Sequence, residues 1–485
     1  MPVVDVKHVA LVGFMGAGKS TLGRRLAGRI RAALTDVDAD LEDQFGPIPD
    51  YFEKHGEAAF RTVEESAVTD ALSRGTRSVV VLGGGAVTSA ATRRLLADRA
   101  TTLWLDVDVE TCWARVRGSD RPLAQHHDDF ERLYDERRPL YADVADAVIR
   151  DDDDAVLAAA DVHVERGALR CLGELVPGEG AVALVSDSHV AGIHGVDAQL
   201  ALGHRLAETH ELPAGEEAKT LAALDHLWQE LRLDRTGTLV ALGGGCTTDA
   251  AGVAAATYLR GIAWVPVPTS LVAQVDAAIG GKTAIDLPQG KNLVGAFHWP
   301  ARTVIDPALL GTLPAEQRRE GMAEVVKTGL LAGEPLWELP DDELVRRCAA
   351  FKAAVCLRDP HDRGERKILN LGHTFAHALE AAAGYEGVTH GRAVALGLLA
   401  ALRLSDRDTA PVEDFSVPPA PGTPTGSLTG VVTDQDTGAP ISGATVGFGG
   451  HASGFPGDYV AVSDATVKVT PSTEVSSRYP LVEAV

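Results

Sequence analysis

The stretch LVALGGGCTTDAAG, Leu239 to Gly252, joins an apolar run to three consecutive glycines, and VVVLGGGAVTS, Val79 to Ser89, does the same earlier in the chain. An apolar run that ends in glycines is typical of a buried strand whose following turn brings the backbone close to a ligand. The two stretches fit either one duplicated domain or two unrelated sites with the same steric demand. The residues that follow each glycine triplet decide between these interpretations.

The composition limits the classes of function. The 485 residues suffice for two to four domains, since a domain usually contains about 50 to 250 residues. The chain has 45 basic and 68 acidic residues, for a formal net charge of -23. This balance argues against a nucleic-acid surface built from Lys and Arg, so an anionic small molecule would need a local basic pocket.

The cysteines and the N-terminal residues indicate the compartment. Five scattered cysteines form no CxxC pair, which argues against a disulfide framework and against a thiolate zinc site. The N-terminus begins a strand at once, without a signal-peptide pattern, and no apolar run reaches the ~18 residues of a membrane-spanning helix. We therefore expect a soluble, cytoplasmic protein without a membrane partner.

The pattern along the chain predicts several domains. Up to Arg150, short apolar strands alternate with helical stretches, which predicts an α/β domain whose parallel sheet is covered by helices on both faces. The acidic run Asp151 to Asp154 marks a linker, although a solvated helix start fits it equally well. The predicted parts are a first α/β domain, a linker, a second α/β domain, a helical domain, a Pro/Gly-rich linker and a β-rich tail, at residues 1–150, 151–161, 162–314, 315–404, 405–426 and 427–485.

A phosphate-binding loop is predicted at the start of the first domain. Residues Gly13 to Ser20 read GFMGAGKS and match GxxxxGK[ST] between a predicted strand and a predicted helix. Backbone N–H groups of such a loop surround phosphate oxygens where a Cβ would collide. Lys19 is expected to bridge the outer phosphates and Ser20 to hold magnesium. The alternative is a glycine-rich turn that contains a lysine by chance, and the predicted strand and helix on either side argue against it. The expected ATP and magnesium residues of the loop are Gly13, Gly16, Ala17, Gly18, Lys19, Ser20 and Thr21.

The first domain resembles shikimate kinase in GFMGAGKST, TDVDADLE, AAFRTVEE, LGGGAVT, DRPL and RRPLY. The resemblance implies that Arg61 and Arg137 clamp the shikimate carboxylate, for which planar guanidinium groups are suited. It also implies that Asp38 accepts hydrogen bonds from shikimate hydroxyls. The backbone of Gly83, Gly84 and Gly85 is then expected near the shikimate ring.

Three catalytic groups follow from the same resemblance. Lys19 is expected at the outer phosphates, and Asp36 lies at a position near the magnesium water shell. Arg121, in the lid of the family, is expected to bind ATP and to reach the transferred phosphoryl group, where charge stabilisation matters most. The chemistry implied is ATP-dependent phosphorylation of shikimate to shikimate 3-phosphate.

The second glycine triplet belongs to a different kind of site. It is followed by Thr247, Thr248 and Asp249, and then by YLRG, PVPTSL, VDAAIGGKT and GKNLVGAF, none of which has a counterpart after Gly85. The two triplets are therefore interpreted as convergence, not duplication. Residues 162 to 404 resemble 3-dehydroquinate synthase, which implies an NAD-binding α/β domain followed by a helical metal-binding domain.

The resemblance assigns two sets of residues in this region. The strand and glycine turn suit a dinucleotide, although the GxGxxG spacing is missing. Ser270 stands where the family has threonine and keeps the hydroxyl. The expected NAD residues are Asp187, Glu216, Lys219, Gly243, Gly244, Gly245, Asp249, Thr269 and Ser270. The expected substrate residues are Arg260, Asp276, Lys282, Lys291, Asn292, Lys327, Lys352, Arg366, Asn370 and His377, with Lys282, Lys327 and His377 also assigned to catalysis.

The metal ligands are the point where spacing and resemblance differ. His373 and His377 are four residues apart, so spacing alone would place both on one helix face as zinc ligands. The resemblance instead assigns Glu324, His373 and His390, and turns His377 toward the substrate phosphate. Two histidines and a carboxylate leave positions open for a substrate diol, which is typical of catalytic zinc, and the residues do not separate zinc from cobalt.

The second reaction implied is conversion of 3-deoxy-D-arabino-heptulosonate 7-phosphate to 3-dehydroquinate with NAD, a divalent metal and elimination of phosphate. Two alternatives are an NAD alcohol dehydrogenase of the glycerol-dehydrogenase type and a catalytically inactive scaffold. The lysines of GGKT and GKN argue against the first, since a simple alcohol needs no phosphate clamp. The expected partners are shikimate, ATP and heptulosonate phosphate, and a homodimer through the synthase region stays open.

The C-terminal part departs from the family. After HGRAVALGLLAALRL the family continues with further helices and a late lysine, and here a Pro/Gly-rich segment follows. The residues GVVTDQDTGAPISGATV resemble a fragment of the β-sandwich modules of carboxypeptidase-regulatory-like domains. We expect a C-terminally incomplete synthase fold with reduced synthase turnover, and a disordered extension is the alternative for the tail.

Overall fold

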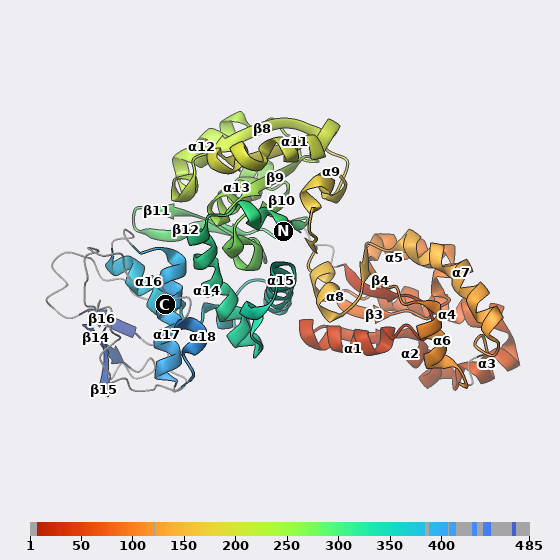
Figure 1. Ribbon diagram of the computed structural model, residues 1–485. Coiled ribbons are helices and arrows are strands. Elements are labelled where there is room, and N and C mark those ends of the chain that lie inside the picture. The colour runs from red at the N-terminus through yellow and green to blue at the C-terminus, as the bar shows by residue number, and fades with distance from the viewer. Residues whose placement is uncertain are drawn as a thin grey trace. The chain divides into compact units, whose positions relative to one another are not determined.

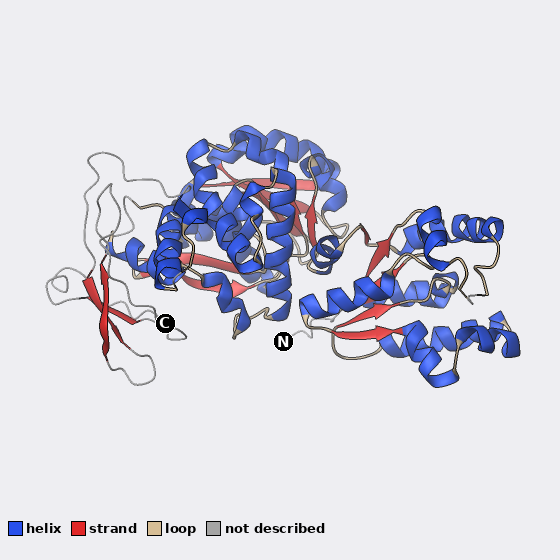
Figure 2. Cartoon of the chain, turned by 60° about the horizontal axis from the view of Figure 1, so that its bottom comes forward, coloured by secondary structure: helices blue, strands red, loops and turns tan. Residues whose placement is uncertain are grey.

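The structure, a computed structural model, describes residues 7–119, 122–383, 388–405 and 407–413, and the backbone of residues 429–433, 440–447 and 468–471 (Figure 1). It divides into two compact units, residues 1–163 with 353–358 and residues 164–352 with 359–485. Figure 2 shows that strands in both units are accompanied by helices.

The first unit contains a five-stranded sheet in the order β2-β3-β1-β4-β5. Every neighbouring pair is parallel, as the alternation of strands and helices predicts. All five residues of the central strand are buried, as in sheets covered on both faces. The strands are β1 (His8–Val12), β2 (Ala33–Asp36), β3 (Ser78–Val81), β4 (Ala100–Leu105) and β5 (Ala147–Ile149).

Helices connect these strands and begin where the expected functional residues lie. The helix α1 starts at Lys19, directly after the glycine loop, and α2 starts after Asp36 at the end of β2. The helices are α1 (Lys19–Ile30), α2 (Val37–Phe45), α3 (Ile48–His55), α4 (Glu57–Leu72), α5 (Ala90–Arg99), α6 (Val109–Val116), α7 (His127–Val144) and α8 (Asp152–Ala159).

The segment 151–161, expected as a linker, contains a helix instead. The Asp151 side chain accepts hydrogen bonds from the N–H groups of Asp153 and Asp154 and so caps α8. Ala155, Val156 and Leu157 are buried, and α8 packs on α1 in the first unit. The acidic run is therefore the first turn of a packed helix, because carboxylates stabilise a helix N-terminus.

The second unit contains a four-stranded parallel sheet in the order β10-β9-β7-β8. Alternate residues of β9 enter different cores: Leu239 and Ala241 pack with α12 and α13, and Val240 and Leu242 pack on the other face. The strands are β7 (Val182–Asp187), β8 (Leu206–Leu212), β9 (Thr238–Gly243) and β10 (Ala263–Pro268). The helices are α9 (Leu172–Leu175), α10 (Ser188–Val190), α11 (Val196–Leu202), α12 (Leu221–Glu230) and α13 (Gly245–Thr257).

A hairpin and a set of helices complete this unit. The strands β11 (Lys282–Leu287) and β12 (Gly290–Phe297) pair antiparallel, and the short strands β6 (Val162–Val164) and β13 (Thr303–Ile305) pair with each other. Apolar residues of α14, α16 and α17 form one core cluster, so the functional positions on these helices are held by shared packing. The helices are α14 (Ala315–Ala332), α15 (Asp341–Arg358), α16 (His373–Ala382), α17 (His390–Leu404) and α18 (Ala410–Glu413).

The backbone of the tail forms a small antiparallel sheet in the order β15-β14-β16. Its strands are β14 (Thr429–Thr433), β15 (Pro440–Gly447) and β16 (Lys468–Pro471). The resemblance of this segment to a β-sandwich module stays a prediction. The expected linker 405–426 contains α18, and its residues 406 and 414–426 lie outside the described part.

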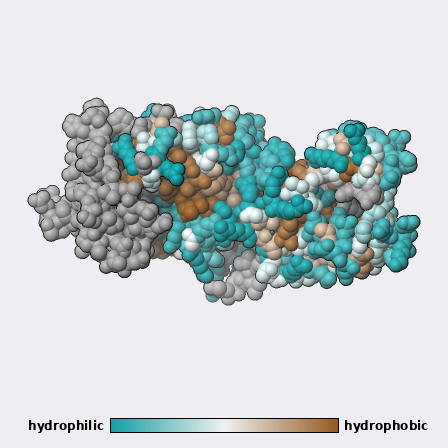
Figure 3. All heavy atoms as spheres, turned by 90° about the horizontal axis from the view of Figure 1, so that it is seen from below, coloured by the Kyte–Doolittle hydropathy of each residue, from teal (hydrophilic) through white to brown (hydrophobic). Residues whose placement is uncertain are grey.

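The described surface carries many polar side chains. The face shown in Figure 3 is largely hydrophilic, with hydrophobic residues gathered in limited areas. Among the described residues, no helix combines the length and the apolar character needed to cross a bilayer.

Candidate functional site

The phosphate loop of the first unit depends on its glycines. Gly13, Gly16 and Gly18 have φ of 148°, 82° and 102°, in the region that favours glycine. A Cβ on Gly16 would lie 2.6 Å from the carbonyl oxygen of Cys112. The loop runs directly into the N-terminus of α1, where free backbone N–H groups and the helix dipole favour an anion.

Lys19 points back into this loop. Its Nζ donates to the carbonyl oxygens of Gly13, at 2.9 Å, and Phe14, at 3.1 Å. Arg115, which the motifs did not single out, donates from Nη1 to the carbonyl oxygens of Gly16 and Ala17 at 3.1 and 3.0 Å. The lysine that a nucleotide would need is therefore already beside the loop, at the start of α1.

A second group of predicted residues lines a cavity of about 220 Å³ in the same unit. Arg61 comes from α4 and Arg137 from α7, so helices far apart in sequence supply the two guanidinium groups. Apolar side chains such as Phe52 and Phe60 complete the wall. We call this cavity the acid pocket. Five of the predicted residues line it: Asp38, Arg61, Gly84, Gly85 and Arg137.

Glu64 is a buried carboxylate of this pocket that sequence reasoning missed. It is 2% exposed, and its Oε2 lies 2.6 Å from Arg61 Nη1. Burial raises the pKa of Glu64, and the charge of Arg61 opposes this only in part. A Cβ on Gly83 would collide with this carboxylate and lie 2.5 Å from Asp38 Oδ1. The spacing of three residues from Arg61 on one helix was the available signal.

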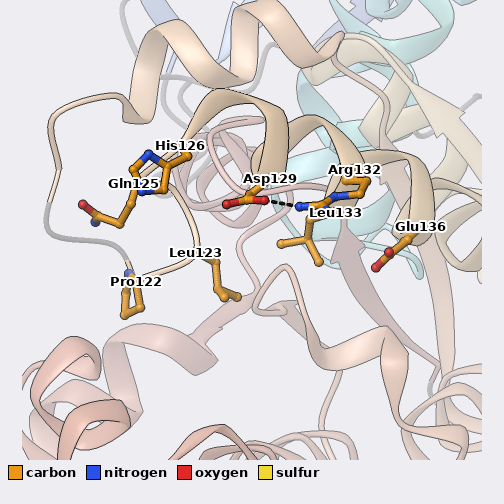
Figure 4. A pocket seen from close by; sticks show the side chains of 8 residues that line it. All are labelled: Pro122, Leu123, Gln125, His126, Asp129, Arg132, Leu133 and Glu136. Carbon is orange, nitrogen blue, oxygen red and sulfur yellow. Dashed lines mark hydrogen bonds and ion pairs between the residues drawn. The ribbon is translucent and has the colours of Figure 1, made fainter.

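The other expected kinase residues either lie near the acid pocket or fall outside the described residues. Asp36 ends β2 and precedes α2, and Gly83 follows β3, which pairs with β2. Arg121 lies outside the described residues. Pro122 and Leu123 line both the acid pocket and a larger cavity of about 400 Å³. In Figure 4, Asp129 and Arg132 of that larger cavity point toward each other and pair, and no expected substrate residue lines it.

In the second unit, the expected NAD residues gather at the carboxyl ends of β7 and β9. In the order β10-β9-β7-β8 the chain leaves β7 toward β8 on one side and returns as β9 on the other. This is a topological switch point, where open α/β sheets form a ligand crevice. Asp187 caps the helix after β7 through the N–H groups of His189 and Val190, and its Oδ2 accepts from Thr247 Oγ1 at 2.9 Å.

The other expected NAD residues are joined to one another by hydrogen bonds and close contacts. The N–H of Thr269 donates to the carbonyl oxygen of Gly243 at 2.9 Å, and Gly245 is the first residue of α13. Lys219 Nζ donates to Asp249 Oδ2 at 2.8 Å and also to Asn292. Burial raises the pKa of Asp249 to about 6, and the charge of Lys219 lowers it in part. Glu216 lies in the same short helix as Lys219, and Ser270 approaches Gly244.

A buried charge cluster connects the sheet to the helices. Lys327 is 1% exposed, and its Nζ lies 2.5 Å from Glu324 Oε2 and 3.5 Å from Asp276 Oδ1. Lys352 Nζ lies 2.5 Å from the same Asp276 oxygen. Burial disfavours the charged form of Asp276, but the two lysines hold its pKa far below the usual range. Burial disfavours the charged form of Lys327 as well, but Asp276 and Glu324 raise its pKa, so this residue presents an ammonium group inside the protein.

Of the other expected substrate residues, some form ion pairs or are buried, and others are exposed. Lys282 pairs with Asp362, and Lys291 Nζ lies 2.7 Å from Glu216 Oε1. Arg366 is buried and donates to the carbonyl oxygen of Gly280 at 2.9 Å. Asn370 is exposed at the end of the short helix Glu365–Asn370. Arg260 is exposed, and no hydrogen bond or ion pair between described residues joins it to the cluster.

Glu324, His373 and His390 form the one group of possible metal ligands among the described residues. Their ligand atoms lie within 4.8 Å of one another, and Glu324 Oε1 is 3.5 Å from His373 Nε2 and 3.8 Å from His390 Nε2. Ligands about 2.0–2.1 Å from a tetrahedral zinc lie roughly 3.3 Å apart, so these residues fit such an ion. Glu324 Oε1 is buried and accepts no hydrogen bond within the described part.

His377 lies outside this ligand group. Its ring contacts that of His373 edge to face, with centroids 5.6 Å apart. Burial lowers the pKa of His373 to about 4, against the charge of Glu324, so this ring is neutral and can ligate a metal at neutral pH. Burial acts in the same direction on His390, but its pKa is raised because Glu380 and Glu324 outweigh burial.

Three family models together match residues 15–166 and 209–415. Shikimate kinase matches residues 15–166, the N-terminal domain of 3-dehydroquinate synthase matches 209–320, and its C-terminal domain matches 321–415. The shikimate kinase match includes α8 and extends beyond the predicted boundary at 150.

Individual proteins are similar to parts of the chain. The 3-dehydroquinate synthase of Bordetella pertussis is 42% identical over 264 residues, which cover 50% of this chain and 74% of that protein. The shikimate kinase of Acinetobacter baumannii, solved with shikimate, is 37% identical over 32% of this chain and 89% of that one, with a TM-score of 0.30. A 2-deoxy-scyllo-inosose synthase, solved with carbaglucose-6-phosphate, NAD+ and Co2+, is 29% identical over 53% of this chain and 78% of that one, with a TM-score of 0.48.

None of these matches favours the alcohol dehydrogenase or the inactive scaffold. Both resemblances expected from the motifs are confirmed by the matching family models, and the synthase resemblance also by the Bordetella pertussis relative. The chain belongs to the 3-dehydroquinate synthase family and carries a shikimate kinase domain ahead of its synthase domains.

Proposed function

We propose that the chain phosphorylates shikimate with ATP and converts 3-deoxy-D-arabino-heptulosonate 7-phosphate to 3-dehydroquinate with loss of phosphate. The acid pocket carries the first assignment, because Arg61 and Arg137 meet there beside Asp38. The charge cluster beside the ligand group Glu324, His373 and His390 carries the second.

The residue types at each site indicate which cofactor the site would bind. The glycine loop with Lys19 and Ser20 suits ATP and Mg2+, and the crevice at β7 and β9 suits NAD. Glu324, His373 and His390 suit Zn2+ or Co2+, which would supply polarisation of a substrate oxygen while NAD supplies hydride exchange.

The residues of the chain have separate tasks in the synthase reaction. Lys282, Lys327 and Lys352 would neutralise the carboxylate and alkoxide of the substrate, and exchange their present carboxylate partners for it. His377 and Arg366 would hold the phosphate. Because Lys327 is fully buried, its ammonium group acts where water does not screen it.

The wider setting is part of the proposal. Residues 1–163 would form the kinase domain, 164–314 the NAD domain and 315–413 the metal domain, with the tail from 427 as a separate module. The net charge of -23 argues against a nucleic-acid partner and fits a cytoplasmic enzyme of anionic metabolites. A second copy of the chain, bound through the synthase region, is the expected protein partner.

Arg61→Ala is expected to raise KM for shikimate about 10- to 100-fold, the usual loss for a charge-assisted hydrogen bond. The effect on kcat should be smaller, because Arg61 holds a part of the substrate that does not react. Steady-state kinetics with shikimate and ATP measure both constants. Arg138→Ala is the matched control, since Arg138 lies on α7 but is largely exposed and pairs with Asp106. An unchanged KM in Arg61→Ala would show that the acid pocket does not bind the shikimate carboxylate.

The synthase assignment is tested by phosphate release from 3-deoxy-D-arabino-heptulosonate 7-phosphate. Release that requires both NAD and a divalent metal is the expected result. The full chain should be used, with its own kinase activity as the measure of correct folding. Protein that holds metal and phosphorylates shikimate but releases no phosphate would instead be a kinase fused to an inactive scaffold.

A further inference from the structure

The helix α16 presents one more functional position than the motifs assigned. His373, His377 and Glu380 are spaced at i, i+4 and i+7, which places them along one face. Glu380 is only 3% exposed. A carboxylate is rarely buried to this extent without a partner, because its loss of hydration costs free energy that only a hydrogen bond or an opposite charge can offset.

The partner is the metal-ligand histidine of the neighbouring helix. Nδ1 of His390 lies 3.3 Å from Glu380 Oε1, whereas Nε2 of the same ring lies 3.8 Å from Glu324 Oε1. The ring therefore lies between two buried carboxylates, one at each nitrogen. In a neutral imidazole one nitrogen donates and the other accepts, so a ring that offers Nε2 to a metal keeps its proton on Nδ1 and can donate it to Glu380. The lone pair of Nε2 then faces Glu324 and His373.

Glu380 is also close to Lys291, one of the expected substrate residues. Its Oε1 lies 3.9 Å from Lys291 Nζ, which in turn lies 2.7 Å from Glu216 Oε1. The lysine partly offsets the burial of the carboxylate. Glu380 thus has contacts toward both the metal ligands and the hairpin β11–β12.

We propose that Glu380 is a positioning residue that fixes the tautomer and the ring orientation of His390 for metal binding. The inference rests on the proposed metal site at Glu324, His373 and His390. Glu380 is not a member of the ligand group and acts through His390. Carboxylates that orient metal-bound histidines in this way are worth about 10- to 100-fold in metal affinity.

The test measures zinc binding directly. Metal-free full-length protein, Glu380→Gln and Glu380→Ala are titrated with Zn2+ against a chromogenic chelator, and the melting temperature is recorded with and without the metal. We expect affinity to fall about 10-fold in the glutamine variant, which keeps a neutral acceptor, and about 100-fold in the alanine variant. Glu338→Gln, which removes an exposed carboxylate outside the site, should bind zinc like the parent.

The outcomes separate this inference from the proposed function. If the parent binds no zinc, the metal site itself is wrong and the role of Glu380 falls with it. If the parent binds zinc and both Glu380 variants match its affinity, only the positioning role is overturned. Metal-free variants that melt well below the parent, with an unchanged shift on adding zinc, would show a structural role alone. Weaker zinc binding with an unchanged metal-free melting temperature supports the inference.

Discussion

A Lys19→Ala variant is expected to lose on the order of 1,000-fold in kcat for shikimate phosphorylation, because the transferred phosphoryl group loses a positioned cation. KM for shikimate should change little, since the acid pocket is built from other elements. Lys19 begins α1, and its Nζ donates to the carbonyl oxygens of Gly13 and Phe14. A nucleotide would draw the ammonium group from these carbonyl oxygens to the outer phosphates.

The second active site of the chain provides an internal control for this variant. Zinc binding at Glu324, His373 and His390 should be unchanged, because it belongs to the other unit. Lys7→Ala, an exposed lysine before β1, is the matched control for loss of one positive charge. The melting temperature of the kinase unit reports whether the loop carbonyl oxygens tolerate loss of their donor. A kcat within 10-fold of the parent, in protein that melts normally, would contradict the role given to Lys19.

The two glycine triplets illustrate what sequence can and cannot establish. Both follow buried strands, as their apolar runs predict. Gly83 leaves room for the carboxylates of Asp38 and Glu64, whereas a Cβ on Gly243 would lie 2.6 Å from the side chain of Thr247. Their sheets have different strand orders, which agrees with convergence. The sequence therefore shows that these positions have no room for a Cβ, but it does not show which neighbouring side chain takes up that space.

Local motifs were predictable because their geometry is set within a few residues. The glycine loop and Lys19 are contiguous, so a spacing pattern finds them. The helical period places His373 beside His377, but it cannot bring His390 to them, because that depends on the packing of α16 on α17. Only the family resemblance supplied His390.

Buried acidic partners were missed for a related reason. Glu64 and Glu380 are ordinary charged residues in the sequence, and charged residues usually face solvent. Their importance appears only when the fold buries them beside Arg61 and His390. The acidic segment at 151–161 was similarly ambiguous, because a capped helix start and a solvated linker have the same composition.

A His373→Ala variant is expected to lose zinc affinity by more than about 100-fold, since even the outer partners of metal ligands are worth 10- to 100-fold. His373 supplies one of three ligand atoms, and its Nε2 lies 3.5 Å from Glu324 Oε1. The two remaining ligands are fewer than the three protein ligands that hold zinc in a catalytic site. Synthase turnover should be lost with the metal, and the kinase rate should stay that of the parent.

Stability gives a second measure of the same loss. The ligands come from α14, α16 and α17, so a bound ion joins three helices of one core. An ion at 100 times its dissociation constant adds about 2.7 kcal/mol to the free energy of unfolding. A chelator should therefore lower the melting temperature of the parent and leave that of His373→Ala unchanged, with His204→Ala, an exposed histidine, behaving like the parent. If chelation lowers the melting temperatures of the parent and of His373→Ala equally, the stabilising ion binds elsewhere. That result would contradict the role of Glu324, His373 and His390 as the ligands of a stabilising metal.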